Sequence, residues 1–316
     1  MDQDDAQQFY EEGRKILLGK EDESLKYGIE LVRRAAEAGN PYAQNEYAKM
    51  FYNGDLVYRD IVTSYGWFVK AAEQGIDESQ YYVGLAYYVG NPVKKDYDEA
   101  IRWFALSAEQ GYAKAQYYVG VCYYNGQGVF KDYREALRWF MLSADRGYSV
   151  ARVALGDAFS DINNPERDYK NAFKLYRLAS DSDDPEGHYK LGLAYYNGKG
   201  VPENYIAASK LFRKGVEAKH YGCAYMLGKM YEEGQGVEAD HNNAVRLLSQ
   251  ASLNGNKDAK TLLEEMSSKE KGKLYFKKIE SVTISFSSTD TPDVIAKVKG
   301  AESVGGGLFG FLRKKE

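Results

Sequence analysis

The chain has 316 residues, of which 44% are hydrophobic and 28% charged, a balance typical of a soluble folded protein. Its net charge of −4 argues against nucleic acid or an anionic membrane as the main ligand. No apolar run approaches the roughly 18 residues that a membrane-spanning helix needs. The N-terminal segment is acidic and polar and lacks the features of a signal peptide. We therefore expect a cytoplasmic protein without a membrane span.

Two cysteines and three histidines give no sign of a metal, a cofactor or a disulfide framework. Cys122 and Cys223 lie far apart in the sequence, where cysteines commonly pack as small hydrophobic residues. His188, His220 and His241 are scattered, without the spacing of metal ligands. We expect no metal site, no cofactor and no disulfide.

The chain repeats itself at an offset of 36 residues, most clearly between residues 79–114 and 115–150. A fixed offset of this size is typical of stacked supersecondary units. We count place 1 of each repeat from Ala43. Residues 1–42 then form a degenerate first repeat, and residues 43–258 form six more, which begin at 43, 79, 115, 151, 187 and 223. Residues 259–271 form a terminal capping helix.

Each repeat is predicted to contain two helices. The first covers about eleven places, with apolar or small residues at places 2, 5, 6 and 9, which share one helical face. Place 18 holds Asp or Asn, good N-cap residues for the second helix. That helix then carries an amphipathic stripe, formed in one repeat by Ala100, Trp103, Phe104, Ser107 and Ala108. Glycines in the turns, such as Gly111, are expected to end the helices.

The pattern of residues 115–147 is A-Q-Y-x-x-G-x-x-Y-Y-N-G-x-G-V-x-x-D-Y-x-x-A-x-x-W-F-x-x-S-A-x-x-G. It resembles the Sel-1-like repeat, a relative of the tetratricopeptide repeat, and the resemblance extends over about residues 7–265. It implies an all-α fold, a right-handed superhelical α/α solenoid of 36-residue helix-turn-helix repeats. It also implies a protein that holds other proteins together as a scaffold or adaptor, rather than an enzyme.

The repeat at residues 151–186 departs from the pattern. Ile162 and Asn164 replace two turn glycines, and Leu175 replaces a tryptophan. We expect the superhelix to bend or loosen there.

The pattern stops after about Met266. Residues 267–316 contain ten Lys/Arg and six Asp/Glu, a net charge of +4, which leaves −8 for the repeats. Val282, Ile284 and Phe286 alternate with Ser and Thr, a short strand signal. We expect residues 272–316 to be a basic flexible tail. It could be a solubilising extension, a docking motif for another protein, or an autoinhibitory segment that folds back onto the acidic repeats.

Tyrosine is unusually abundant, with 29 residues. Places 3 and 10 lie on one helical face, roughly 120° from the core. In tetratricopeptide-like solenoids the first helices line the concave groove, so the resemblance places this stripe there. We hypothesise a peptide-binding groove; the alternative is that the tyrosines pack between neighbouring first helices. The stripe comprises Tyr52, Tyr81, Tyr88, Tyr117, Tyr124, Tyr189, Tyr196 and Tyr225.

Other motifs point to no convincing chemistry. The GxG pieces recur once per repeat at helix ends, where a structural turn is expected, and lack the strand of a phosphate loop. Ser268 and Lys271 match S-x-x-K without the other elements of a β-lactam-hydrolysing site. We predict no catalytic residues and a non-enzymatic scaffold that binds a protein or peptide of unknown identity along the groove. Two alternatives are a small-molecule hydrolase of the β-lactamase type, reported for some cysteine-rich relatives, and an adaptor autoinhibited by its tail.

Overall fold

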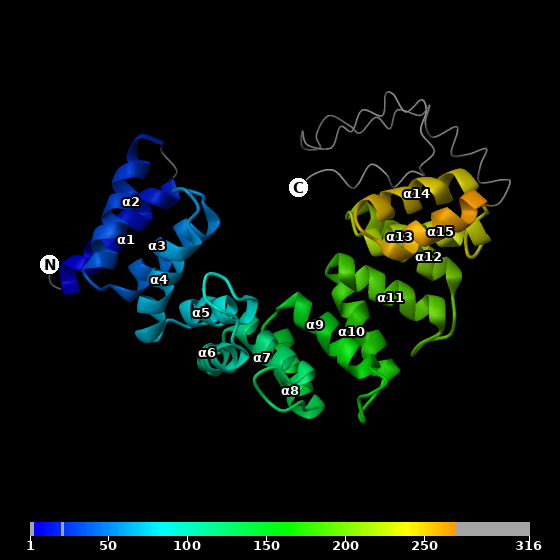
Figure 1. Ribbon diagram of the computed structural model, residues 1–316, viewed down its shortest axis with the longest axis horizontal. Coiled ribbons are helices and arrows are strands. Elements are labelled where there is room, and N and C mark those ends of the chain that lie inside the picture. Colours follow the sequence, from blue (N-terminus) through cyan, green and yellow to red (C-terminus); the bar gives the residue numbers. More distant parts are fainter. Residues whose placement is uncertain (1–2, 20–21, 269–316) are drawn as a thin grey trace.

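The computed structural model describes residues 3–19 and 22–268, and this part of the chain contains fifteen α-helices and no strand (Figure 1). The helices form a solenoid of paired units, which confirms the predicted fold class. They are α1 (Gln3–Gly19), α2 (Asp22–Glu37), α3 (Pro41–Asn53), α4 (Ile61–Glu73), α5 (Asp77–Val89), α6 (Tyr97–Glu109), α7 (Ala113–Asn125), α8 (Tyr133–Asp145), α9 (Ser149–Ser160), α10 (Tyr169–Asp181), α11 (Pro185–Asn197), α12 (Tyr205–Glu217), α13 (Tyr221–Glu233), α14 (His241–Leu253) and α15 (Lys257–Ser268).

The turn between the two helices of a repeat is fixed at both ends by local hydrogen bonds. Gly90 ends α5 at φ 84°, and its N–H donates to the carbonyl of Ala86. Asp96 begins α6 as an N-cap, and its carboxylate accepts from the backbone N–H groups of Asp98 and Glu99. The N–H of Asp96 in turn donates to the carbonyl of Tyr87 over 3.0 Å, which closes the turn onto α5. The place-18 residues are N-caps in the other repeats too, as the sequence indicated.

Within a repeat, the two helices meet where a glycine faces an aromatic ring. Gly120 on α7 lies against Phe140 on α8, and a Cβ atom added to the glycine would be 2.6 Å from the ring. Gly84 and Phe104 make the same contact one repeat earlier. The missing side chain therefore allows the close approach of the two helices, and the aromatic ring fills the space between them.

Successive repeats are joined by the same few polar contacts. The side chain of Gln80 donates from Nε2 to the carbonyl of Ala72 over 3.2 Å, and Gln116 does the same to Ala108. The Ser107 hydroxyl donates to the carbonyl of Asp77 over 2.7 Å. These bonds add a side-chain donor to backbone carbonyls near the helix ends, and the two glutamine bonds tie each repeat to the one before it.

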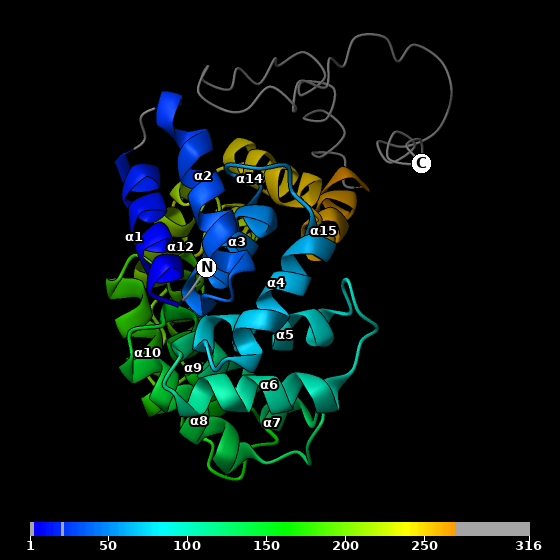
Figure 2. The ribbon, with the colours of Figure 1, turned by 90° about the vertical axis from the view of Figure 1, so that its left-hand side faces the viewer.

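The solenoid curves into an arc. In Figure 1, α5 and α7 lie on its inner side and α6 and α8 on its outer side. Figure 2 shows the N-terminal and C-terminal repeats rising on the same side of the middle repeats. We call the surface formed by the first helices of the repeats (α3, α5, α7, α9, α11 and α13) the inner face.

The irregular repeat at residues 151–186 keeps both of its helices, α9 and α10, which pack against α8 and α11. Buried Asn164 stands where three other repeats have a turn glycine. Its side chain donates to the carbonyl of Ala158 over 2.7 Å and accepts from the N–H of Glu166. Asp183, with φ 54°, takes the position after α10 where other repeats use glycine. Side-chain hydrogen bonds thus hold a turn that the missing glycines would otherwise form.

The expected tail, with its strand signal at residues 282–286, lies outside the described residues. Within the part that the structure describes, no helix combines the length and apolar character needed to cross a membrane.

Candidate partner-binding surface

All eight tyrosines of the predicted groove lie on first helices, and most of their surface is covered. Tyr81 is only 7% exposed, and the other seven are half-buried. Their rings pack mainly against neighbouring aromatic residues. Burial raises the pKa of Tyr117 to about 12, so its hydroxyl stays protonated at neutral pH.

Three of the four tyrosines at place 10 join one repeat to the next through their hydroxyl groups. Tyr88 donates to Oε1 of Gln127 over 3.0 Å, and Tyr196 donates to Gln235 over 2.8 Å. Tyr124 donates instead to the Asp161 carboxylate over 2.6 Å. This bond is the main cause that lowers the pKa of Asp161. These three hydroxyls are therefore engaged by the following turn.

The tyrosines at place 3 pack between successive first helices. Tyr81 on α5 contacts the ring of Tyr118 on α7 with centroids 5.8 Å apart. Tyr189 on α11 stacks near His220 at 4.9 Å, just before α13. Tyr52, from place 10, likewise contacts Tyr82 at 4.9 Å. The structure thus brings members of the stripe into aromatic clusters with residues of neighbouring repeats.

Further apolar residues of the first helices, which the repeat pattern did not single out, are half-buried beside the core clusters or, at Val89, exposed. They stand at places 4, 7 and 11, on the side of the helix opposite the stripe at places 2, 5, 6 and 9. On α5 these places hold Tyr82, Leu85 and Val89, and on α7 they include Tyr118 and Val121. Val89 is 56% exposed. The sequence contained this signal, because several of these places hold apolar residues although they lie opposite the buried stripe of the helix.

Charged residues replace this apolar stretch on the first helices to either side. On α3, Lys49 pairs with Glu78 over 3.2 Å, and Asn45 donates to the same carboxylate. Toward the C-terminus, Lys190 of α11 pairs with Asp157 of α9 over 2.9 Å. The apolar inner face of α5 and α7 is therefore bordered by ion pairs that bridge adjacent repeats.

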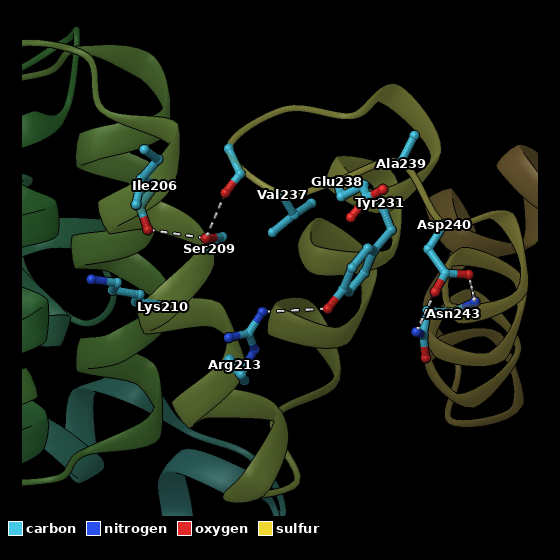
Figure 3. Close-up of a pocket in the computed structure, with 11 residues that line it drawn as sticks. Ile206, Ser209, Lys210, Arg213, Tyr231, Val237, Glu238, Ala239, Asp240 and Asn243 are labelled. Atoms are coloured by element: carbon cyan, nitrogen blue, oxygen red, sulfur yellow. Dashed lines mark hydrogen bonds between the residues drawn. The ribbon is translucent and has the colours of Figure 1, made fainter.

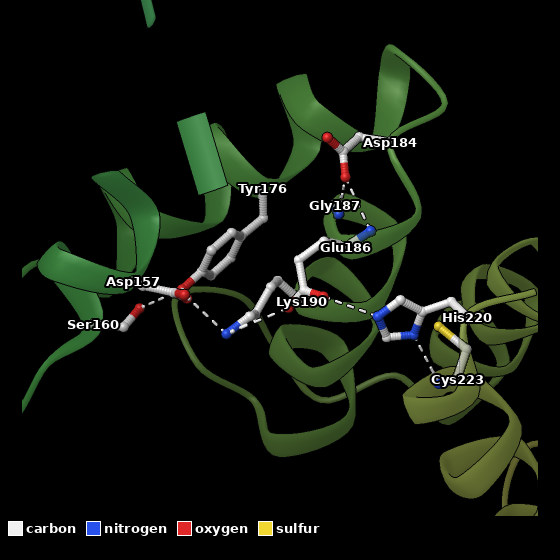
Figure 4. Close-up of polar contacts among 9 residues, drawn as sticks. All are labelled: Asp157, Ser160, Tyr176, Asp184, Glu186, Gly187, Lys190, His220 and Cys223. Atoms are coloured by element: carbon white, nitrogen blue, oxygen red, sulfur yellow. Dashed lines mark hydrogen bonds and ion pairs between the residues drawn. The ribbon is translucent and has the colours of Figure 1, made fainter. Parts of the chain in front are cut away.

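A polar network spans α9, α10 and α11 beside this border (Figure 4). The Tyr176 hydroxyl donates to Oδ1 of Asp157 over 2.8 Å and lies 3.1 Å from the Ser160 hydroxyl. Lys190 binds the other oxygen of Asp157 and lies 3.7 Å from Glu186. Burial beside Asp157 raises the pKa of Tyr176, which keeps the phenol protonated as the donor.

His220 extends the network to α13. The N–H of Cys223 donates to Nδ1 of His220 over 3.1 Å, so the ring proton lies on Nε2 and faces Glu186 at 2.9 Å. Both ring nitrogens are therefore occupied by protein groups. The contact with His220 is the main cause that lowers the pKa of Glu186. We interpret the network as a structural link between three successive repeats. Because both ring nitrogens are engaged, the imidazole has none left to act on a substrate.

We expect buried His188 to make the stability of the protein depend on pH. It is 3% exposed, with Nδ1 2.7 Å from the Ser180 hydroxyl and Nε2 3.8 Å from the Asp183 carboxylate. Burial, reinforced by Lys214, lowers its pKa from the ordinary 6.5, despite opposing contributions from Asp183 and Asp184. The unfolded chain therefore binds a proton more readily than the folded one, and stability falls as the pH drops through about 6.5.

Replacing His188 with glutamine is expected to reduce this acid sensitivity. Three other repeats carry glutamine at the same place (Gln44, Gln80 and Gln116), each bonded to a carbonyl of the preceding repeat. The measurement is the denaturation midpoint of wild type and His188→Gln at pH 7.5 and 5.5. The difference between the two proteins isolates His188, since all other ionisable groups are shared. Equal losses of stability on acidification would contradict this assignment.

The described residues contain no cluster of His, Cys, Asp or Glu that could hold a metal ion. Both cysteines are buried and free, and burial raises the pKa of Cys122 to about 12, so its thiol is unreactive at neutral pH. The S-x-x-K motif lies outside the described part, because neither the Ser268 side chain nor Lys271 is included.

Stacked helix pairs with an exposed inner face define the class of α/α-repeat solenoids that bind other molecules along their length. The Sel1-repeat model matches residues 6–40, 41–76, 77–112, 113–148, 150–184, 185–220 and 222–256, and the chain belongs to this family. Sel1-repeat proteins generally serve as scaffolds for protein interactions and are typically not enzymes.

Two solved structures share the fold. One is a protective antigen of uropathogenic Escherichia coli, with 30% sequence identity and a TM-score of 0.70 over 84% of this chain. The match covers 58% of that protein's length. The other is a Sel1-repeat protein from Oxalobacter formigenes, with 26% identity and a TM-score of 0.70 over 77% of this chain and 96% of that one. The search of curated proteins gives no match.

Proposed function

We propose that this protein is a non-enzymatic scaffold that binds a segment of another protein on its inner face, centred on α5 and α7. The observation that carries the proposal is the group of apolar side chains at places 4, 7 and 11 of α5 and at places 4 and 7 of α7, where place 11 holds Asn125. Aromatic and aliphatic residues there offer contact area to an apolar segment, and the bordering ion pairs offer hydrogen bonds to its flanks.

The partly covered tyrosines of the stripe fit this role as supports. Their hydroxyls and rings fix the spacing of neighbouring first helices, and their exposed edges extend the contact surface. A surface held rigid in this way loses little conformational entropy when a partner binds.

A matched pair of valine substitutions tests the proposal. Val89→Lys places a charge at the C-terminal end of α5, and Val62→Lys makes the same change on α4, where the side chain is 69% exposed. Partners are first captured from lysate of the native host, and the leading one is purified. Its affinity for the three proteins is then measured by biolayer interferometry, after circular dichroism has confirmed their folding.

We expect at least tenfold weaker binding to Val89→Lys and unchanged binding to Val62→Lys, since burying an unpaired charge in an interface is unfavourable. A partner that binds both variants as tightly as wild type would rule out the inner face as the site.

A further inference from the structure

The repeats differ in the size of the side chain at place 23, which lies on the second helix. Place 23 carries a large apolar side chain in the other repeats that follow Ala43. In several it packs on the aromatic residue at place 9 of the next repeat. The Tyr65 ring lies 6.4 Å from Tyr87, and the Phe173 ring lies 5.3 Å from Tyr195. The place is occupied by Tyr65, Ile101, Leu137, Phe173 and Val245, but by Ser209 on α12.

Ser209 leaves a cavity where the larger side chains would stand. Its hydroxyl is bonded to the carbonyls of Ile206 and Gly236, at 3.0 and 3.3 Å. In front of it, between α12 and the loop that joins α13 to α14, lies a cavity of about 600 Å³ (Figure 3). Tyr231, the place-9 residue of the next repeat, forms part of its wall together with Ile206 and Val237. These three residues give the cavity an apolar part of its wall, next to polar and charged lining residues.

Cations stand at the edge of the cavity. Arg213 donates from Nη2 to the Tyr231 hydroxyl over 3.3 Å, and Lys210 lies one turn away on the same helix. Lys210 also lines an adjoining groove of about 460 Å³, together with Arg177 and Lys214. Within the described chain, none of these four side chains forms an ion pair with a carboxylate.

Acidic residues are present on the opposite walls but are partly engaged. Asp240 caps α14, accepting from the N–H and the side chain of Asn243, and these bonds lower its pKa. Glu238 lines the cavity, while Asp181 and Asp183 line the adjoining groove. The α12 side of the site is therefore the cationic one, in a repeat region whose overall charge is negative.

We propose that this cavity binds a segment of a partner protein in which an aromatic side chain is followed by carboxylates. The aromatic ring would take the place that Phe173 fills one repeat earlier and pack against Tyr231. The carboxylates would form charge-assisted hydrogen bonds with Arg213 and Lys210. This site is separate from the inner face and goes beyond the proposed function.

The test uses the full chain and three synthetic hexapeptides in isothermal titration calorimetry. The first peptide has one phenylalanine followed by two glutamates. The second has alanine in place of the phenylalanine, and the third has lysines in place of the glutamates. We expect the first to bind at least tenfold more tightly than either of the others.

Four variants locate the binding. Ser209→Phe and Ser209→Ile restore the side chains found at the same place in other repeats. Both should fill the cavity and weaken binding of the first peptide at least tenfold. Lys210→Glu should do the same by reversing the charge. Lys174→Glu is the matched control, because Lys174 is the equivalent residue one repeat earlier, beside Phe173, and it should leave binding unchanged.

Circular dichroism establishes that each variant is folded. The isoleucine variant and the charge reversal keep the test decisive should the phenylalanine prove too large. The proposal is overturned if the first peptide shows no binding to wild type, if the lysine peptide binds as tightly, or if folded Ser209→Ile and Lys210→Glu both retain full affinity. The Val89→Lys variant should bind this peptide like wild type, which separates this site from the inner face.

Discussion

Phe104→Ala is expected to lower the free energy of unfolding by about 3–5 kcal/mol, the range for truncating a buried aromatic side chain. Phe104 is fully buried and stacks on Tyr118 with ring centroids 5.0 Å apart. It also fills the space above Gly84. Because the facing residue is a glycine, it has no side chain of its own that could move into the cavity. The loss should therefore be near the full cost of an empty cavity.

The measurement is urea denaturation followed by far-ultraviolet circular dichroism. Phe130→Ala is the matched control, because Phe130 is 97% exposed in a turn. We expect a change within about 0.5 kcal/mol for this exposed site. Similar losses in the two variants would show that Phe104 does not have the packing role described here.

Gly120→Ala is expected to destabilise the protein by about 1–3 kcal/mol, as overpacking of a core does. The new Cβ atom would lie 2.6 Å from the Phe140 ring, so α7 and α8 would have to move apart. The same change at Gly66 should have the opposite sign. Nothing lies within 4 Å of a Cβ atom added there, on α4. Alanine in an open helical position is favoured over glycine by up to about 1 kcal/mol.

Denaturation curves of the two variants test this difference in sign. A further variant that combines Gly120→Ala with Phe140→Leu should recover part of the loss relative to the sum of the single changes, since the smaller side chain gives the methyl group room. Strict additivity of the two changes would argue against the contact between these residues.

The repeat made much of the fold predictable from the sequence. Place 18 predicted N-caps because the Asp side chain needs only the next few backbone groups, as Asp96 shows. The small residue at place 6 is equally local, because the aromatic ring that packs on it belongs to the same repeat, as with Gly120 and Phe140. Local rules and a constant offset were sufficient for these features.

The contacts between repeats were not predictable in the same way. The Tyr88 hydroxyl reaches Gln127, which lies in the turn of the next repeat. Tyr124 uses Asp161 instead, because that repeat has a different turn. Which atom meets a tyrosine thus depends on the conformation of the following turn, and the repeat pattern does not specify that conformation.

Ser209 is a departure from the repeat pattern whose structural effect could not be inferred from the sequence. A serine among large apolar residues at place 23 can be read from the sequence. Only the position of Tyr231 beside it shows that the exchange opens a cavity.

The tyrosine bonds between successive repeats also have a mechanical consequence. Each bond joins a first helix only to the turn of the following repeat. The repeats are therefore linked in series, and the molecule should behave as a spring. A force that breaks the hydrogen bond between Tyr196 and Gln235 changes the spacing of the repeats there and leaves the bond between Tyr88 and Gln127 intact. When the two ends of the molecule are pulled, it should extend one repeat at a time, beginning at the weakest contact between repeats.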